Sequence, residues 1–294
     1  MRVLLTGGSG FIAAHVLDTL LQRGHSVVTS VRSLEKAKQI QAAHPDIPKS
    51  KLDFAIVEDI AQPGAFDEAV KSDPHGIAVI TSSFAAMLDS SKGHWPTHTY
   101  NESSWNPVTI SDASKDPATG YRASKTHAEK AAWDFVATSQ PNFTLATINP
   151  PMVFGPIIHN LSTLTTLNTS NQLFRDLIQG VHKNGPIPPN GTFIWVDVRD
   201  VALAHVRAME VPEAGGKRFF ATAGHYSNKE IVEIIRQDFP QFADGLPGKE
   251  MEGNFPEEIY KVDMERVRGV LGIEFRDLRS TVVDTVRSLE AVGV

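Results

Sequence analysis

The sequence predicts an α/β fold, in which a doubly wound parallel sheet is joined by a small C-terminal α+β lobe. The chain opens with an apolar run at 2–6, a glycine-rich turn and an amphipathic helix that extends to Leu21. Further on, short β-branched runs alternate with helical segments, which is typical of a parallel sheet. The 294 residues are enough for one large domain with a smaller lobe.

The individual strands and helices are predicted from residue types and from the turn and capping residues between them. Short apolar, β-branched runs predict strands at 2–6, 26–31, 52–57, 77–80, 143–148 and 217–221, and residues 193–201 join a short strand to a helix that ends near Met209. Further helices are expected at 65–71, 120–133, 170–178, 227–239 and 278–289. Ser227, with Glu230 three residues later, is a capping box. Residues 88–117 are polar and turn-rich, which predicts a long loop.

The composition excludes several classes of protein. The net charge of −6 comes from interspersed acidic and basic residues, unlike a nucleic-acid-binding surface. The absence of cysteine excludes disulfides and thiol nucleophiles, and the eleven scattered histidines lack the spacing of metal ligands. Neither a signal peptide nor an apolar run of membrane-spanning length is recognisable. We therefore expect a cytoplasmic protein without a metal, a membrane or a nucleic acid as partner.

The glycine-rich turn is a candidate phosphate-binding loop. Gly7, Gly10 and Ala13 have the spacing G-x-x-G-x-x-A directly after the first predicted strand. Small residues let the backbone approach a pyrophosphate, and the helix N-terminus supplies N–H donors and the positive end of its dipole. A tight turn that binds no ligand can have the same spacing. The prediction of a phosphate-binding loop therefore depends on the order of strand, turn and helix.

Positive charge follows the second predicted strand. Arg32 ends that strand, and Lys36 lies one turn into the next helix. A carboxylate near this point binds the ribose 2′-hydroxyl of NAD, whereas a cation accommodates a 2′-phosphate. The two cations therefore predict NADPH, with a basic surface helix as the alternative. Asp59, after the third strand, is a candidate acceptor for the adenine amine or else a turn residue.

Tyr121 and Lys125 are the candidate proton-transfer pair. They lie four residues apart in a segment rich in Ala, Glu, Lys and Arg, so they share one helix face. The ammonium favours the phenolate, which makes Tyr121 a candidate general acid for a carbonyl oxygen. Ser83, just past the strand at 77–80, could donate to the same oxygen. Each residue alone is equally compatible with an ordinary surface or turn position.

Together, these segments resemble the extended short-chain dehydrogenase/reductase superfamily, which has a Rossmann-type fold. Within it, the chain is similar to fungal NADPH-dependent carbonyl reductases of the methylglyoxal and 3-methylbutanal reductase group, relatives of plant dihydroflavonol reductases and cinnamoyl-CoA reductases. The resemblance spans nearly the whole chain. It is carried by residues 6–13, 32–37, 81–86, 101–107, 121–125, 129–133, 149–150, 153–156, 167–170 and 196–201.

The resemblance implies roles for particular residues. Tyr121 would protonate the substrate oxygen, Ser83 would polarise the carbonyl, and Lys125 would hold the cofactor ribose. The cofactor site would comprise Gly7, Gly10, Phe11, Ile12, Arg32, Lys36, Asp59, Ile60, Tyr121, Lys125, Pro150 and Val153. Phe84 and Asn168 would face the substrate. We expect an NADP-binding Rossmann domain over 1–156, to which 193–222 returns, and a substrate-binding lobe over 157–192 and 223–294.

One part of the family pattern has no counterpart here. In the family, a strand and a long helix precede the strand that carries the catalytic serine, whereas here His75 and Gly76 lead directly into that strand. A unit of this kind needs at least ~30 residues. Either the strand at 77–80 moves into the vacant central position, which displaces Ser83 by about 4.8 Å, or the sheet keeps a gap.

Three functions follow from these observations. The leading hypothesis is an enzyme, monomeric or homodimeric, that reduces a small aldehyde or ketone with NADPH. The missing unit favours a second hypothesis, a catalytically impaired truncated or splice remnant with weak or no nucleotide binding. A third is a nucleotide-sensing regulator of the same fold, which would need neither Tyr121 nor Lys125. A nucleotide-sugar epimerase fits the segments at 84–86 and 101–107 less well.

Overall fold

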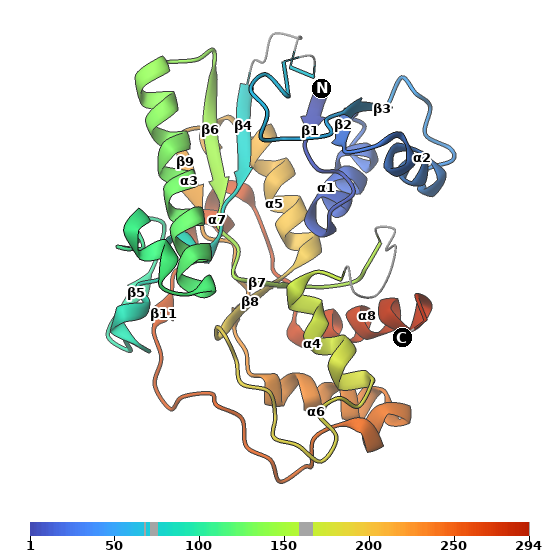
Figure 1. Ribbon diagram of the computed structural model, residues 1–294, viewed down its shortest axis with the longest axis vertical. Coiled ribbons are helices and arrows are strands. Elements are labelled where there is room, and N and C mark those ends of the chain that lie inside the picture. Colours follow the sequence, from blue (N-terminus) through green and yellow to red (C-terminus); the bar gives the residue numbers. More distant parts are fainter. Residues whose placement is uncertain (68, 71–75, 159–166, 294) are drawn as a thin grey trace. The chain divides into compact units, whose positions relative to one another are not determined.

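The computed structural model describes residues 1–67, 69–70, 76–158 and 167–293. The chain divides into two compact units (Figure 1). Unit 1 comprises Met1–His75 and Ile157–Asn168, and unit 2 comprises Gly76–Pro156 and Thr169–Val294. Each unit has parallel strands connected by helices, so the predicted α/β class is confirmed. The units do not coincide with the predicted cofactor and substrate domains, and that functional division stays a prediction.

Unit 1 contains a three-stranded parallel sheet. Its strands β1 (Arg2–Leu5), β2 (Ser26–Val31) and β3 (Leu52–Ile56) pair in the order β1-β2-β3. Helices α1 (Phe11–Gln22) and α2 (Leu34–Ala43) connect successive strands and pack against β2. The three strands and α1 match their predicted bounds closely, and α2 is the helix expected around Lys36.

The helix expected over 65–71 is a wrong prediction. The described residues 65–67 and 69–70 form turns, while Glu68 and Lys71 lie outside the described residues. The segment follows Pro63-Gly64 and is shorter than an isolated helix needs to be stable, so residue propensity alone does not sustain it.

The main sheet of unit 2 is also parallel. Strands β4 (Gly76–Thr81), β6 (Phe143–Ile148) and β9 (Lys217–Phe219) pair in the order β4-β6-β9. Helix α3 (Pro117–Ser139) packs against β6, and α5 (Val198–Glu210) packs against β4 and β6. Fully buried side chains of β6, β9, α5 and α7 (Glu265–Leu271) form the core.

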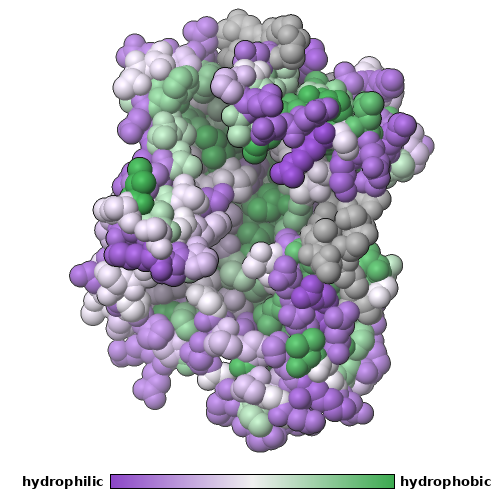
Figure 2. Space-filling model, viewed as in Figure 1, coloured by the Kyte–Doolittle hydropathy of each residue, from purple (hydrophilic) through white to green (hydrophobic). Residues whose placement is uncertain are grey.

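The described residues of unit 2 also form two small sheets and three further α-helices, besides short 3-10 turns. Strands β7 (Met152–Phe154), β8 (Ile194–Asp197) and β10 (Gly224–His225) form one sheet, and β5 (Thr99–Tyr100) pairs with β11 (Lys261–Val262). Helix α8 (Leu278–Ala291) packs against α4 (Thr169–Ile178) and α6 (Asn228–Asp238). The predicted capping box of Ser227 and Glu230 begins α6, over which the visible surface is mainly hydrophilic (Figure 2). In the described ranges, no helix is sufficiently long and apolar to cross a membrane.

The two parallel sheets share no strand. β1 pairs with β2, β4 pairs with β6, and no described strand pairs with the second edge of either. None of the six residues of β4 is fully buried, whereas four of the six residues of β6 are. In the described residues one edge of β4 is therefore without a paired strand, and which of the two outcomes expected from the missing unit holds stays a prediction.

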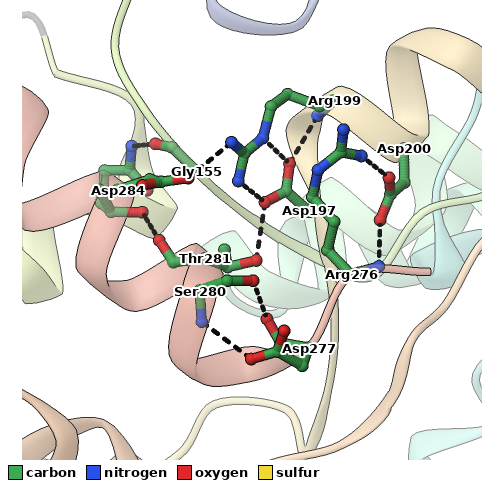
Figure 3. A network of polar contacts seen from close by, with 11 residues as sticks. Gly155, Asp197, Arg199, Asp200, Arg276, Asp277, Ser280, Thr281 and Asp284 are labelled. Carbon is green, nitrogen blue, oxygen red and sulfur yellow. Dashed lines mark hydrogen bonds and ion pairs between the residues drawn. The ribbon is translucent and has the colours of Figure 1, made fainter.

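An ion network joins α5 to α8 in unit 2 (Figure 3). Asp197 caps α5 and accepts bonds from Arg199 N and Nε at 2.7 and 2.9 Å, from Arg199 Nη2 at 2.7 Å and from Thr281 Oγ1 at 2.7 Å. Arg199 Nη1 reaches Asp284 Oδ2 at 2.6 Å, and Arg276 binds Asp200. Burial alone would raise the pKa of Asp197, but the bonds from Arg199 and Thr281 hold this pKa below its ordinary value.

His205 of α5 holds the end of β4. Its Nδ1 lies 2.8 Å from the Val201 carbonyl oxygen, which can only accept, so Nδ1 carries the proton. Nε2 is then the acceptor for Thr81 Oγ1 at 2.7 Å. Burial lowers the pKa of His205 to about 4, against a small opposing effect of the Val201 bond.

We expect acid to destabilise the chain through His205. Its folded pKa of about 4 lies below the ordinary 6.5, so between these values the unfolded chain binds more protons. The unfolding free energy that His205 contributes, about 3 kcal/mol, is fully present above the ordinary pKa. It is lost as the pH falls toward 4. Urea unfolding of the wild type and His205→Gln at several pH values measures it. The wild type should lose more stability on acidification, and parallel losses would contradict the assignment.

Candidate active site

The glycine turn of unit 1 is built for close backbone approach. Gly7 has a φ of +70°, a conformation that favours glycine, and its N–H donates to Ser30 Oγ at 3.1 Å. Gly10 N–H donates to the Gly7 carbonyl at 2.9 Å, which closes the turn. At Gly8, a Cβ would lie 2.1 Å from Thr29 Oγ1, so this position also requires glycine. The predicted cofactor site did not include Gly8. The sequence feature that could have indicated it is the Gly7-Gly8 pair within the G-x-x-G-x-x-A motif.

The N-terminus of α1 has the donors that a pyrophosphate needs. Gly10 is the N-cap and supplies no side-chain bond to the helix. Within the described residues, the N–H groups of Ile12 and Ala13 have no acceptor. Phe11 is buried and meets the ring of His15 edge to face. The turn and the helix end therefore fit the phosphates of a dinucleotide.

The predicted adenosine-side residues also belong to unit 1. Arg32 is exposed and Lys36 half-buried, and neither side chain has an ion-pair partner in the described part of the chain. Two unpaired cations beside the first turn of α2 suit a 2′-phosphate. Asp59 is exposed and accepts from Ala61 N at 2.9 Å, so it stabilises a turn, and Ile60 is 63% exposed. Contacts of these two residues with adenine stay predictions.

Ser83 lies just beyond β4 in unit 2. Its Oγ accepts from Ala85 N at 3.1 Å and caps the short helical turn at 84–86. Because Oγ is the acceptor in this bond, the hydroxyl proton is free to be donated. On either side of Ser83, Ser82 N donates to Ile148 O at 2.8 Å and Phe84 N to Pro150 O at 2.9 Å. Ser83 is thus held firmly at the carboxyl end of the strand.

Tyr121 and Lys125 lie one turn apart on α3. Asp116 caps this helix through Thr119 N at 2.8 Å, and Pro117 occupies its first turn. Tyr121 is 53% exposed, and neither its hydroxyl nor the Lys125 ammonium is bonded to any described residue. Because α3 packs against the turn that Ser83 caps, the structure brings the three predicted catalytic residues into the same part of unit 2.

The remaining predicted residues are more buried. Pro150 and Val153 are buried at the β6–β7 corner of unit 2. Phe84 is 3% exposed and stacks on Phe220 at a centroid distance of 5.3 Å, which favours a core role; its substrate contact stays a prediction. Asn168, in unit 1, has a buried Oδ1 without a hydrogen-bond partner in the described residues, and its contact with a substrate stays a prediction.

Comparison with known proteins identifies the family. Residues 3–95 and 96–221 match the NAD dependent epimerase/dehydratase family. The chain belongs to this family, which confirms the resemblance inferred from its sequence. A solved structure of Gre2 from Candida albicans in complex with NADPH has a TM-score of 0.91 to this chain at 30% identity, with 100% of both chains covered. The Rossmann-type fold is thereby confirmed.

Two characterised relatives span almost the whole chain. A ketoreductase of Aspergillus niger, azaE, is 41% identical over 329 positions, which cover 98% of this chain and 97% of the relative. The NADPH-dependent methylglyoxal reductase GRE2 of Saccharomyces cerevisiae is 32% identical over 339 positions and 98% of either chain. Since 329 aligned positions exceed the 294 residues by 35, at least 35 positions of the ketoreductase have no counterpart here. This excess agrees with the loss of one strand–helix unit.

Proposed function

We propose that the chain reduces a small aldehyde or ketone to an alcohol with NADPH. One observation carries the proposal. In a chain of this family, Tyr121 and Lys125 lie on a helix that packs against the turn capped by Ser83, and their polar groups are bonded to no described residue. The relatives are a ketoreductase and an NADPH-dependent methylglyoxal reductase, so the predicted cofactor and reaction class are confirmed at the level of the family.

The residues of this chain have complementary tasks in such a reduction. NADPH, when bound, supplies the hydride. Tyr121 donates a proton to the carbonyl oxygen, while Ser83 donates a hydrogen bond to the same oxygen and so stabilises the charge that develops there. Lys125 stabilises the phenolate that Tyr121 leaves behind and binds the cofactor ribose. The N-terminus of α1 and the cations Arg32 and Lys36 would hold the phosphates.

Binding and turnover should be measured separately on purified protein. NADPH is titrated by fluorescence or calorimetry, and its oxidation is then followed with methylglyoxal and small ketones as substrates. Saturable binding and turnover support the proposal. Binding without turnover supports an impaired remnant instead, and no binding at millimolar NADPH excludes both the enzyme and a nucleotide sensor.

The impaired remnant is the second candidate function, and one observation favours it. In the described residues one edge of β4 has no paired strand, which supports the absence of the strand that the resemblance to the family leads us to expect there. Catalysis is sensitive to position, since a displacement of about 1 Å can cost ~100-fold in rate. Turnover that Tyr121→Phe abolishes would rule the remnant out.

The cations of unit 1 give a prediction about cofactor choice. Replacing both Arg32 and Lys36 by Ala should raise the Kd for NADPH about 10- to 100-fold, because two charged contacts to a phosphate are lost. The Kd for NADH should change much less, since NADH lacks that phosphate. Lys38→Ala, an exposed cation on the same helix, is the matched control. Equal losses for both cofactors would contradict a role in selecting the 2′-phosphate.

A further inference from the structure

Glu129 of α3 bonds to residues in or directly after all three strands of the main sheet in unit 2. Its side chain is almost completely buried. The carboxylate accepts from Ser82 Oγ after β4, from Thr147 Oγ1 of β6 at 2.9 Å and from Asn149 Nδ2 after β6 at 2.8 Å. Arg218 of β9 binds both oxygens, through Nε at 2.7 Å and Nη2 at 3.3 Å. We call these five residues the Glu129 network.

The network is charged and its polar groups are well satisfied. Burial alone would raise the pKa of Glu129, but Arg218, Ser82 and Asn149 hold this pKa below its ordinary value, so the carboxylate is ionised at neutral pH. Desolvation cancels much of the attraction in a buried ion pair, so such a pair contributes little net stability. What a fully bonded pair does provide is one defined geometry for the elements that it joins.

Arg218 is itself held from its other side. Its Nη1 donates to the carbonyl oxygens of Glu102 and Ser104, both at 2.7 Å. Its guanidinium lies 3.7 Å from the centroid of the Trp105 ring. All three nitrogens of the guanidinium are therefore engaged, and the Glu129 carboxylate has a fixed partner.

One branch of the network reaches the backbone of Ser83. Asn149 Nδ2, which donates to Glu129, also lies 3.3 Å from the Ser83 carbonyl oxygen. Ser82, the residue before Ser83, donates its hydroxyl to the same carboxylate. Glu129 therefore fixes the peptide unit of Ser83 from two directions.

Glu129 is also connected to Tyr121 and Lys125 through α3 itself. Glu129 lies four residues after Lys125 and eight after Tyr121, which is one and two helical turns of about 5.4 Å each. A continuous helix is rigid over this length, so the anchor at Glu129 sets the axial position and rotation of Tyr121 and Lys125 relative to the strand ends.

We propose that Glu129 is a positioning residue for the reduction: it couples the Ser83 strand end to the helix of Tyr121 and Lys125 without touching substrate. This inference rests on the proposed function. It assigns to a residue outside the catalytic triad the task of keeping the two donors to the carbonyl oxygen in register. Because no described strand pairs with the second edge of β4, we expect the position of this strand to depend more strongly on the coupling.

The test compares Glu129→Gln and Ser82→Ala with the wild type. In Glu129→Gln, an amide NH₂ replaces one of the two acceptor oxygens and faces groups that donate. In Ser82→Ala, one hydrogen bond to Glu129 is lost while the ion pair with Arg218 remains. We expect kcat to fall about 10- to 100-fold in Glu129→Gln and less in Ser82→Ala, because a small displacement of positioned groups is costly. The Kd for NADPH should stay within about threefold, since the phosphate-binding residues are untouched. Asp134→Asn and Ser139→Ala, exposed on the same helix, are the matched controls.

Hydrogen exchange gives a second measurement that needs no turnover. In both variants, amides of 82–87 and of 121–125 should exchange several-fold faster than in the controls. Wild-type kcat in the folded variants overturns the inference and leaves the proposed reduction intact. If the wild type binds no NADPH or has no turnover, the proposed function has failed, and unchanged exchange in both segments would then overturn the coupling as well. If Glu129→Gln does not fold, Ser82→Ala decides by the same criteria.

Discussion

Replacing Tyr121 by Phe should lower kcat about 10²- to 10⁴-fold, the usual contribution of a positioned general acid. The substitution removes only the hydroxyl of a half-exposed side chain that has no bond to any described residue, so the fold should be unaffected. NADPH binding should change far less, because the donors of the α1 turn remain. Single-turnover measurement of NADPH oxidation separates the chemical step from binding.

Tyr226→Phe is the matched control for Tyr121→Phe. Tyr226 is 2% exposed and packs edge to face on Phe154 at a centroid distance of 5.1 Å. Loss of the Tyr226 hydroxyl should affect packing and stability. The kcat of this variant should stay within about twofold of the wild-type value, since Tyr226 transfers no proton in the reaction. Equal rates for wild type and Tyr121→Phe would refute the assignment of the general acid.

Replacing Asp197 by Ala should cost about 3 kcal/mol of unfolding free energy, the sum of a lost helix cap and lost charged hydrogen bonds. Asp197 is fully buried and accepts four bonds, three of them from Arg199. Its removal leaves Thr281 Oγ1 buried without this acceptor. The expected decrease in Tm is about 6–12 °C for a unit of this size.

Asp277→Ala separates the cap from the buried charge. Asp277 caps α8 by accepting from Ser280 N at 2.9 Å, without a strong charged partner, so this variant should lose only about 1 kcal/mol. Chemical unfolding of the two variants side by side gives the difference. If both lose the same free energy, the Asp197–Arg199 pair adds nothing beyond capping.

Local signals explain what could be predicted of the fold. The strands around the glycine turn, the α6 capping box and the helix that carries Tyr121 depend on neighbours in sequence, and the structure contains all of them. The segment at 65–71 failed because helix propensity without packing is too weak. The neighbours of β4 depend on strand pairing between distant segments, so the sequence left two outcomes open.

The candidate site divides in the same way. Tyr121, Lys125 and the glycine turn have fixed spacings and could be recognised from the sequence. The Glu129 network could not, because Glu129 and Arg218 are 89 residues apart and their contact exists only after β9 joins β6. The one available signal was that Glu129 follows Lys125 by one helical turn. The need for glycine at position 8 was missed because it comes from the Thr29 side chain, which lies on the next strand.

The unpaired edge of β4 has a consequence for solubility. The strand reads Gly-Ile-Ala-Val-Ile-Thr, without a charge or a proline, and Ile80 is 38% exposed. An apolar edge of this kind is a template on which another chain can add a strand, and natural sheets usually guard such edges with lysine or proline. We therefore expect this edge to favour self-association of the chain.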